Sequence, residues 1–128
     1  MSNTDLIRRG YHAFNTADMG VLDEVFADDA VWTTPGASSI AGTAHGKGAV
    51  FSHFGRYGGE TAGTFRAELL DVFEAEDGRV IGLHRNIAQR DERQLDTACC
   101  LVFEVANGQI ASGTEYFFDL HQWDQFWS

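Results

Sequence analysis

The spacing of the apolar residues changes once along this chain, and that change limits the folds it can adopt. Up to about Tyr57 the apolar residues recur at three- and four-residue spacing, as on one face of a helix. After Gly58-Gly59 they alternate, as in strands that bury one face. Hairpin signals divide this second part into four runs, at Asp77-Gly78, Asp91-Glu92 and Asn107-Gly108. The sequence therefore predicts helices first and then a four-stranded antiparallel meander.

The first part is expected to hold three helices and one short strand. The first helix runs from Asn3 to about Thr16, and the second runs from an Asp18 cap through Phe26. A strand from Val31 to Thr34 ends at Pro35, the only proline of the chain. The third helix follows from about Gly46 to Tyr57. Packing of these helices on one face of the sheet gives an α+β fold with a single domain over residues 1–128.

Two further segments carry expectations of their own. The segment from Gly36 to Gly46 is small and polar, and we expect a loop that covers a site. The C-terminal segment brings three large aromatic residues together and must dock on the fold, namely Trp123, Phe126 and Trp127.

Charge and composition exclude several kinds of partner. The formal net charge is −10, so the field of the protein repels nucleic acid and anionic membranes. The start of the chain resembles no signal peptide, and a cytoplasmic location is the expectation. Gly46-Lys47-Gly48 lacks the spacing of a phosphate loop, and no cofactor or metal site is expected. Cys99 and Cys100 are neighbours on a strand and are predicted to be free thiols.

Several segments stand in a characteristic order along nearly the whole chain, namely Phe26-Ala27-Asp28-Asp29, Trp32, Pro35-Gly36, Ala41-Gly42-Thr43, Leu95-Asp96, Gly108-Gln109-Ile110 and Asp124-Gln125-Phe126-Trp127. In their order and spacing they resemble the SnoaL-like branch of the nuclear transport factor 2-like superfamily. The resemblance implies a cone-shaped α+β fold with three N-terminal helices in the concave face of a curved, mixed, mostly antiparallel sheet. It also implies a cavity between helices and sheet, and a homodimer through the outer sheet face. The third run is partly apolar on both faces, which agrees with a covered outer face.

The resemblance includes ketosteroid isomerases, but their catalytic groups are missing from this sequence. In those enzymes a carboxylate base directly precedes the proline, where this chain has Thr34. A hydroxyl without an activating partner cannot remove a proton from carbon near neutral pH. The two acidic donors of that enzyme fall on Gly10, with Tyr11 one place off, and on Leu101. We therefore do not expect ketosteroid isomerisation by the known mechanism.

A comparison with limonene epoxide hydrolase-like sites moves attention to the long strands. Glu115 matches an aspartate of that site, and the other two positions fall on His84 and Asn86. A register shift of one residue would replace these two by Arg85 and Ile87. We take His84 and Glu115 as the acid and base candidates. Glu115 could instead pair with an arginine on the outer side of the sheet.

Two functions remain open at this point. The chain is either a cofactor-free isomerase, cyclase or hydrolase, or a non-catalytic ligand-binding or dimeric assembly module. In both cases the expected ligand is a small apolar organic molecule. The other histidines are expected at the surface, namely His12, His45, His53 and His121. The residues expected to form the pocket are Trp32, Thr34, Phe54, Asn86, Leu101, Phe103 and Phe117.

Overall fold

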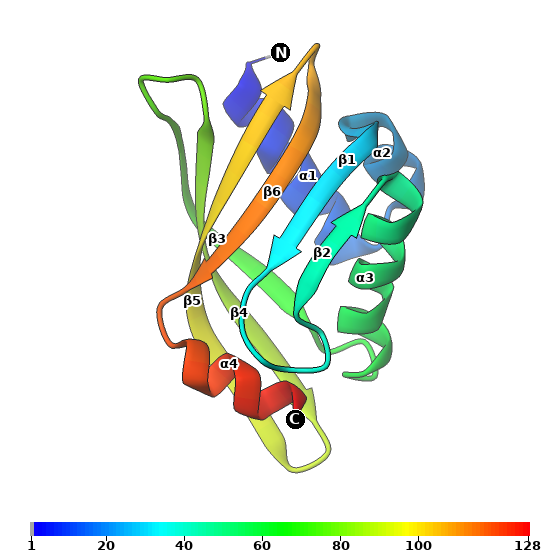
Figure 1. Cartoon of the computed structure of the whole chain (residues 1–128), viewed down its shortest axis with the longest axis vertical. Coiled ribbons are helices and arrows are strands. Elements are labelled where there is room, and N and C mark those ends of the chain that lie inside the picture. Colours follow the sequence, from blue (N-terminus) through cyan, green and yellow to red (C-terminus); the bar gives the residue numbers. More distant parts are fainter. Residues whose placement is uncertain (1) are drawn as a thin grey trace.

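Four helices and six strands make up the fold of this protein, for which we use a computed structural model (Figure 1). It describes residues 2–128. None of the helices among those residues is long and apolar enough to cross a membrane. In chain order the elements are α1 (Asn3–Thr16), α2 (Met19–Val25), β1 (Phe26–Thr34), β2 (Gly42–His45), α3 (Lys47–Gly59), β3 (Arg66–Glu74), β4 (Val80–Arg90), β5 (Arg93–Ala106), β6 (Gln109–Phe117) and α4 (Leu120–Trp127).

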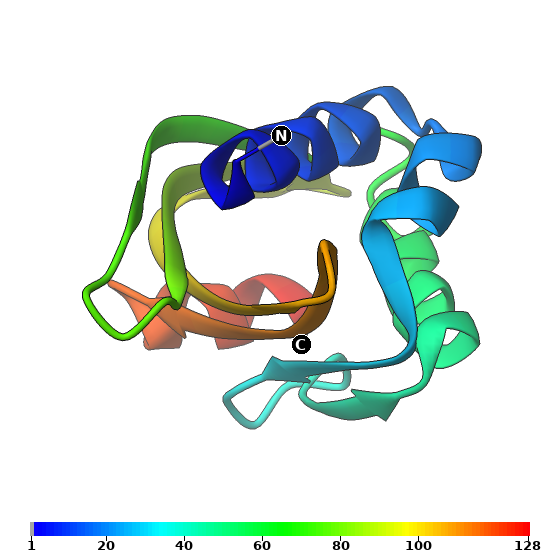
Figure 2. The same ribbon diagram turned by 90° about the horizontal axis from the view of Figure 1, so that it is seen from above.

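The strands form one curved sheet in the order β2-β1-β6-β5-β4-β3. β1 runs parallel to β6, and all other neighbours are antiparallel. Seen from above, the sheet bends around the interior, and α1, α2 and α3 close the remaining sides (Figure 2). The predicted α+β class with a curved, mixed, mostly antiparallel sheet is confirmed.

The first two helices begin where the sequence predicts, at Asn3 and after the Asp18 cap, and the structure adds Ser2 as the cap of α1. The Ser2 hydroxyl accepts a hydrogen bond from the backbone N–H of Asp5, and the Asp18 carboxylate accepts one from Val21. α1 then turns its apolar side, with Ile7 and Tyr11, toward the sheet. The meander is also as predicted, since Asn107 and Gly108 both have positive φ angles, 53° and 74°. Two-residue hairpin loops of this type require that conformation.

Three segments differ from the sequence-based expectation. Phe26 ends α2 and already has the extended backbone of β1, because it pairs with Ile110 of a strand far away in the chain. The segment from Gly36 to Gly46 is not only a loop, since β2 occupies its second half and pairs with β1. The C-terminal aromatic segment forms a fourth helix, α4, capped by the Asp119 side chain.

α4 docks on the sheet end and on the loop after β1. Trp123 stacks on Phe117 with ring centroids 3.9 Å apart. The Asp124 carboxylate accepts a hydrogen bond from the backbone N–H of Ala37, and Arg90 donates one to the carbonyl of Phe126. These contacts build a second, smaller core beside the main one between the helices and the sheet.

Candidate functional site

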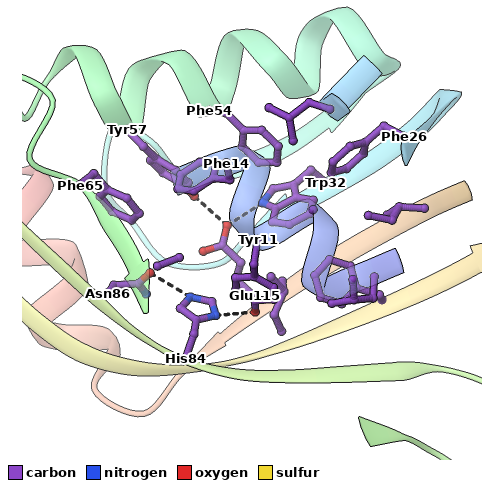
Figure 3. Close-up of a pocket in the computed structure, with 17 residues that line it drawn as sticks. Tyr11, Phe14, Phe26, Trp32, Phe54, Tyr57, Phe65, His84, Asn86 and Glu115 are labelled. Carbon is purple, nitrogen blue, oxygen red and sulfur yellow. Dashed lines mark hydrogen bonds between the residues drawn. The ribbon is translucent and has the colours of Figure 1, made fainter. Parts of the chain in front are cut away.

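An internal cavity of about 50 Å³ lies between α1, α3 and the concave face of the sheet. Its wall is mainly aromatic and aliphatic, and among the described residues no lysine or arginine lines it. Only a few polar groups reach it, and they form two hydrogen-bonded clusters (Figure 3). Of the residues predicted from the sequence, those that line it are Trp32, Phe54, His84, Asn86, Leu101, Phe103 and Glu115.

The first cluster surrounds the carboxyl group of Glu115, which is only 3% exposed. Its Oε1 atom accepts hydrogen bonds from Trp32 Nε1 at 2.6 Å, Tyr57 OH at 2.7 Å and Thr34 Oγ1 at 3.0 Å. Oε2 accepts no hydrogen bond from residues 2–128. It is also not fully enclosed, unlike the other buried polar atoms that lack a partner. One oxygen of Glu115 is therefore held by the protein, and the other is left for the cavity. We call these residues, with His53, the carboxylate cluster.

The strand register explains why this carboxylate lies beside Thr34. β1 and β6 run in parallel with Thr33 opposite Thr114, so the next residues of both strands, Thr34 and Glu115, point to the same inner face. The carboxylate that position 34 lacks is thus presented from the neighbouring strand. The two alternatives for Glu115 are thereby decided, since it lies inside the sheet and not with the outer arginines.

Burial and hydrogen bonding act on Glu115 in opposite directions. Burial raises the pKa of this carboxyl group above its usual range, and the bonds from Tyr57, Trp32 and Thr34 partly offset that rise. Burial also raises the pKa of Tyr57, so its hydroxyl keeps its proton and remains a donor. A carboxyl group in such a place can hold or release a proton closer to neutral pH than a surface glutamate.

His53 joins this cluster from α3, contrary to its expected surface position. Its Nε2 atom lies 2.9 Å from Thr34 Oγ1 and 2.9 Å from Tyr57 OH. Burial, and secondarily the charge of Arg56, lowers the pKa of His53 to about 4. The expectation failed because residues at spacing i, i+4 share a helix face, and Tyr57 turns that face inward.

The second cluster consists of Tyr11, His84 and Asn86. The pairing of β4 with β5 places His84 and Asn86 inside, while Arg85 lies outside and bonds Asp96 at 2.7 Å. The Tyr11 hydroxyl lies 2.7 Å from His84 Nδ1, and His84 Nε2 lies 2.9 Å from Asn86 Oδ1. We call these three residues the histidine cluster.

The protonation states in the histidine cluster follow from burial. Burial lowers the pKa of His84 to about 4 and raises that of Tyr11, so both groups are neutral near pH 7. Tyr11 then donates to Nδ1, and the Nε2–H group donates to the Asn86 carbonyl oxygen. This leaves the Asn86 Nδ2 group buried at the edge of the cavity, without a hydrogen-bond partner among residues 2–128.

Two predicted pocket residues do not line the cavity. Thr34 is buried behind Glu115 and bonds its carboxylate, and Phe117 belongs to the second core, where it stacks on Trp123. Sequence reasoning in turn missed Tyr11 and Tyr57. Both belong to buried helix faces, so their hydroxyl groups had to find polar partners inside.

Comparisons with known proteins agree with this architecture. A model of the SnoaL-like domain matches residues 7–113. The uncharacterised protein Rv0034 of Mycobacterium tuberculosis is 32% identical over 127 residues, covering 99% of this chain and 97% of its own. The solved structure of Bal32a, from a soil-derived mobile gene cassette, is 55% identical with a TM-score of 0.97, covering 98% of this chain and 96% of that one.

More distant solved structures share the fold. They include cystatin-like and nuclear transport factor 2-like proteins of unknown function. Another is IdmH from Streptomyces antibioticus, described as a candidate polyketide cyclase, with 17% identity, a TM-score of 0.77 and 98% of both chains covered. At that identity only the fold is shared. The family match over residues 7–113 covers most of the sequence, and the chain therefore belongs to the SnoaL-like domain family.

Proposed function

We propose that the cavity binds a small, neutral, mostly apolar organic molecule and that Glu115 exchanges a proton with it. One observation carries this proposal: Oε1 of the buried carboxyl group accepts three hydrogen bonds, while Oε2 has no donor within the described part of the chain. A carboxyl group fixed in this way can act as acid or base without a cofactor. The reaction would be an isomerisation, a cyclisation or a hydrolysis.

The polar groups of the wall restrict the ligand. An anionic ligand would meet the Glu115 carboxyl without any lysine or arginine in the lining to balance its charge. A neutral ligand with a carbonyl, ether or hydroxyl oxygen can accept the unpartnered N–H of Asn86. The remaining wall favours an apolar body.

The size of the cavity requires that it open before such a ligand binds. Its volume of about 50 Å³ is small beside the ~150 Å³ of an engineered cavity that admits benzene. Phe14 packs edge to face on Phe54 and Phe65, with ring centroids 5.4 and 5.9 Å apart, and all three rings are partly exposed. We propose that Phe14 swings out to enlarge the cavity.

The fold relatives support the same class of ligand by analogy, since IdmH is described as a candidate polyketide cyclase. The small cavity favours a second function, a ligand-binding or assembly module without catalysis. The two functions differ in turnover and share the binding step.

The experiment uses three small neutral probes, a cyclic enone, an epoxide and a lactone. Binding is followed by the NMR signal of the Trp32 indole N–H, which bonds Glu115, and turnover by chromatography of the probe. Phe14→Ala should bind at least ~10-fold more tightly than the parent chain, because it enlarges the cavity. Phe73→Ala is the matched control, since Phe73 is an exposed phenylalanine on β3.

Glu115→Gln separates the two functions. This variant should keep binding and lose turnover by about 100-fold or more if Glu115 is the acid or base. Binding without turnover in the parent chain would establish the module in place of the enzyme. No binding by either the parent chain or Phe14→Ala would refute the proposal.

We further propose that two copies pair through the outer face of the sheet. Cys100 and Val102 of β5 are only partly covered there, and Tyr116 of β6 is 55% exposed. The charges at the edge of this face are partly neutralised within the chain, since Arg85 bonds Asp96 and lies near Glu68. Sedimentation should show a dimer that Val102→Glu converts to a folded monomer, while a monomeric parent chain would refute this pairing.

A further inference from the structure

We infer that His53 is the port through which the buried carboxyl group of Glu115 exchanges protons with solvent. The role of this port rests on the acid–base function proposed for Glu115. His53 is a relay residue, since it acts through Thr34 and Tyr57 and does not line the cavity.

A continuous line of hydrogen bonds connects the carboxyl group to the outside. Glu115 Oε1 bonds Tyr57 OH at 2.7 Å and Thr34 Oγ1 at 3.0 Å, and both of these oxygens lie 2.9 Å from His53 Nε2. The other ring nitrogen, Nδ1, has no hydrogen-bond partner among residues 2–128. It is also not fully enclosed by protein atoms. Nδ1 therefore reaches solvent.

The donors and acceptors in this line are ordered for transfer. Tyr57 and Thr34 donate to Glu115 when the carboxylate is charged, so each of their oxygens can accept the Nε2–H of His53. A proton that arrives at Nδ1 can release the Nε2 proton to one hydroxyl oxygen. That hydroxyl gives its own proton to Glu115 Oε1. One proton enters, one reaches the carboxylate, and the neutral ring is left as its other tautomer.

The other sides of Glu115 offer no comparable path. Trp32 Nε1 is a donor only and cannot pass a proton on. The cavity wall is mainly apolar, and its second polar group, the histidine cluster, makes no hydrogen bond to the carboxylate cluster among the described residues. Within the part of the chain that the structure covers, the line through His53 is the polar connection between Glu115 and solvent.

The test follows the carboxylic acid C=O stretch of Glu115 by time-resolved infrared spectroscopy after a pH jump, without any ligand. Glu115→Gln assigns the band by its loss. In His53→Gln the side-chain amide can still bond Thr34 and Tyr57 but cannot carry a proton. We expect the midpoint of the Glu115 titration to stay nearly unchanged and its protonation to slow by at least ~10-fold. His12→Gln, on the exposed side of α1, should leave the rate unchanged.

Rescue gives a second readout that a purely structural role of His53 would not produce. His53→Ala leaves space for free imidazole, which should restore fast protonation in proportion to its concentration. Equal rates in the parent chain and His53→Gln would overturn the inference, as would rescue failing in His53→Ala. These results are independent of ligand binding, so failure of the relay and failure of the proposed function are distinguishable.

Discussion

Two histidines of this protein have a similarly lowered pKa but differ in whether they can exchange a proton with solvent. Burial lowers the pKa of both His84 and His53 to about 4, and each contacts a tyrosine hydroxyl. His84 lies on a central strand under α1 and is 3% exposed, with both ring nitrogens bonded inside. His53 lies on a surface helix and keeps one nitrogen free toward solvent. A lowered pKa therefore does not by itself distinguish a wall residue from a proton route.

The clusters around these two histidines differ in charge as well. The histidine cluster is neutral, and one of its donors, the Asn86 amide, has no partner in the portion of the chain that the structure describes. The carboxylate cluster contains the ionisable Glu115 and directs its donors to one oxygen. The first cluster is thus suited to orient an oxygen of a ligand, and the second to move a proton. The following predictions test this division.

The largest effect is expected from Glu115→Leu, which removes the acceptor of the carboxylate cluster. The indole N–H of Trp32 would then be buried without a partner, and Tyr57 and Thr34 would lose their acceptor. We expect a loss of about 2–4 kcal/mol in the free energy of unfolding, measured with urea. Glu115→Gln keeps a carbonyl acceptor and should not show this loss. Equal losses in both variants would contradict the role of the hydrogen bonds.

Glu115→Gln also reports on the charge. The folded-state pKa of Glu115 is raised, so its contribution to stability is present below the unfolded pKa and is lost as pH rises through the folded value. Glutamine does not ionise. The stability of Glu115→Gln relative to the parent chain should therefore increase with pH, and a constant difference would show that the folded-state pKa of Glu115 is not raised.

The next prediction compares the stability effects of the two histidines at acidic pH. Their folded-state pKa values are depressed from 6.5 to about 4, so stability is full above about pH 6.5 and falls as pH decreases toward 4. Protonation of a group as buried as His84 corresponds to roughly 3 kcal/mol. His84→Gln should remove most of this pH dependence. His53→Gln should remove less, because its ring is partly exposed and solvent screens the charge. Urea unfolding at several pH values measures both, and equal slopes would contradict the comparison.

The sequence predicted those parts of the fold that depend on local pattern. The bounds of α1, the Asp18 cap of α2 and the turn at Asn107-Gly108 were correct because each is decided by neighbouring residues. Phe26 was assigned to a helix because its pairing partner, Ile110, is distant in the chain. β2 was missed for the same reason, since Gly42–His45 has no strong strand pattern and becomes a strand only beside β1.

The site was predicted in part, and the missing part is the set of partners. The alternating pattern placed His84 and Asn86 on one face of the strand. Whether this face or that of Arg85 points inward could be decided only from the pairing of β4 with β5. Tyr57 was expected at the end of the third helix, but its bond to Glu115 joins residues 58 positions apart. Tyr11 was noted only as one place off the donor position of the ketosteroid isomerases, and its bond to His84 joins residues 73 positions apart. Hydrogen bonds between distant elements depend on docking, which no local pattern encodes.

The smallest effects are expected from two strand glycines that make room for the aromatic members of the clusters. A Cβ atom at Gly82 would collide with the Tyr11 ring, and one at Gly113 would collide with the Trp32 ring. Each Gly→Ala variant should cost about 1–3 kcal/mol by overpacking. Gly55→Ala is the control, because Gly55 lies in α3 with nothing within 4 Å of the added atom.

For these two variants, which NMR signal shifts is more informative than how much stability is lost. Gly113→Ala should shift the NMR signal of the Trp32 indole N–H and leave the ring nitrogens of His84 in place, because Trp32 bonds only the carboxylate cluster. Gly82→Ala should do the reverse through Tyr11. If either variant disturbed both signals, the two clusters would be coupled through the cavity.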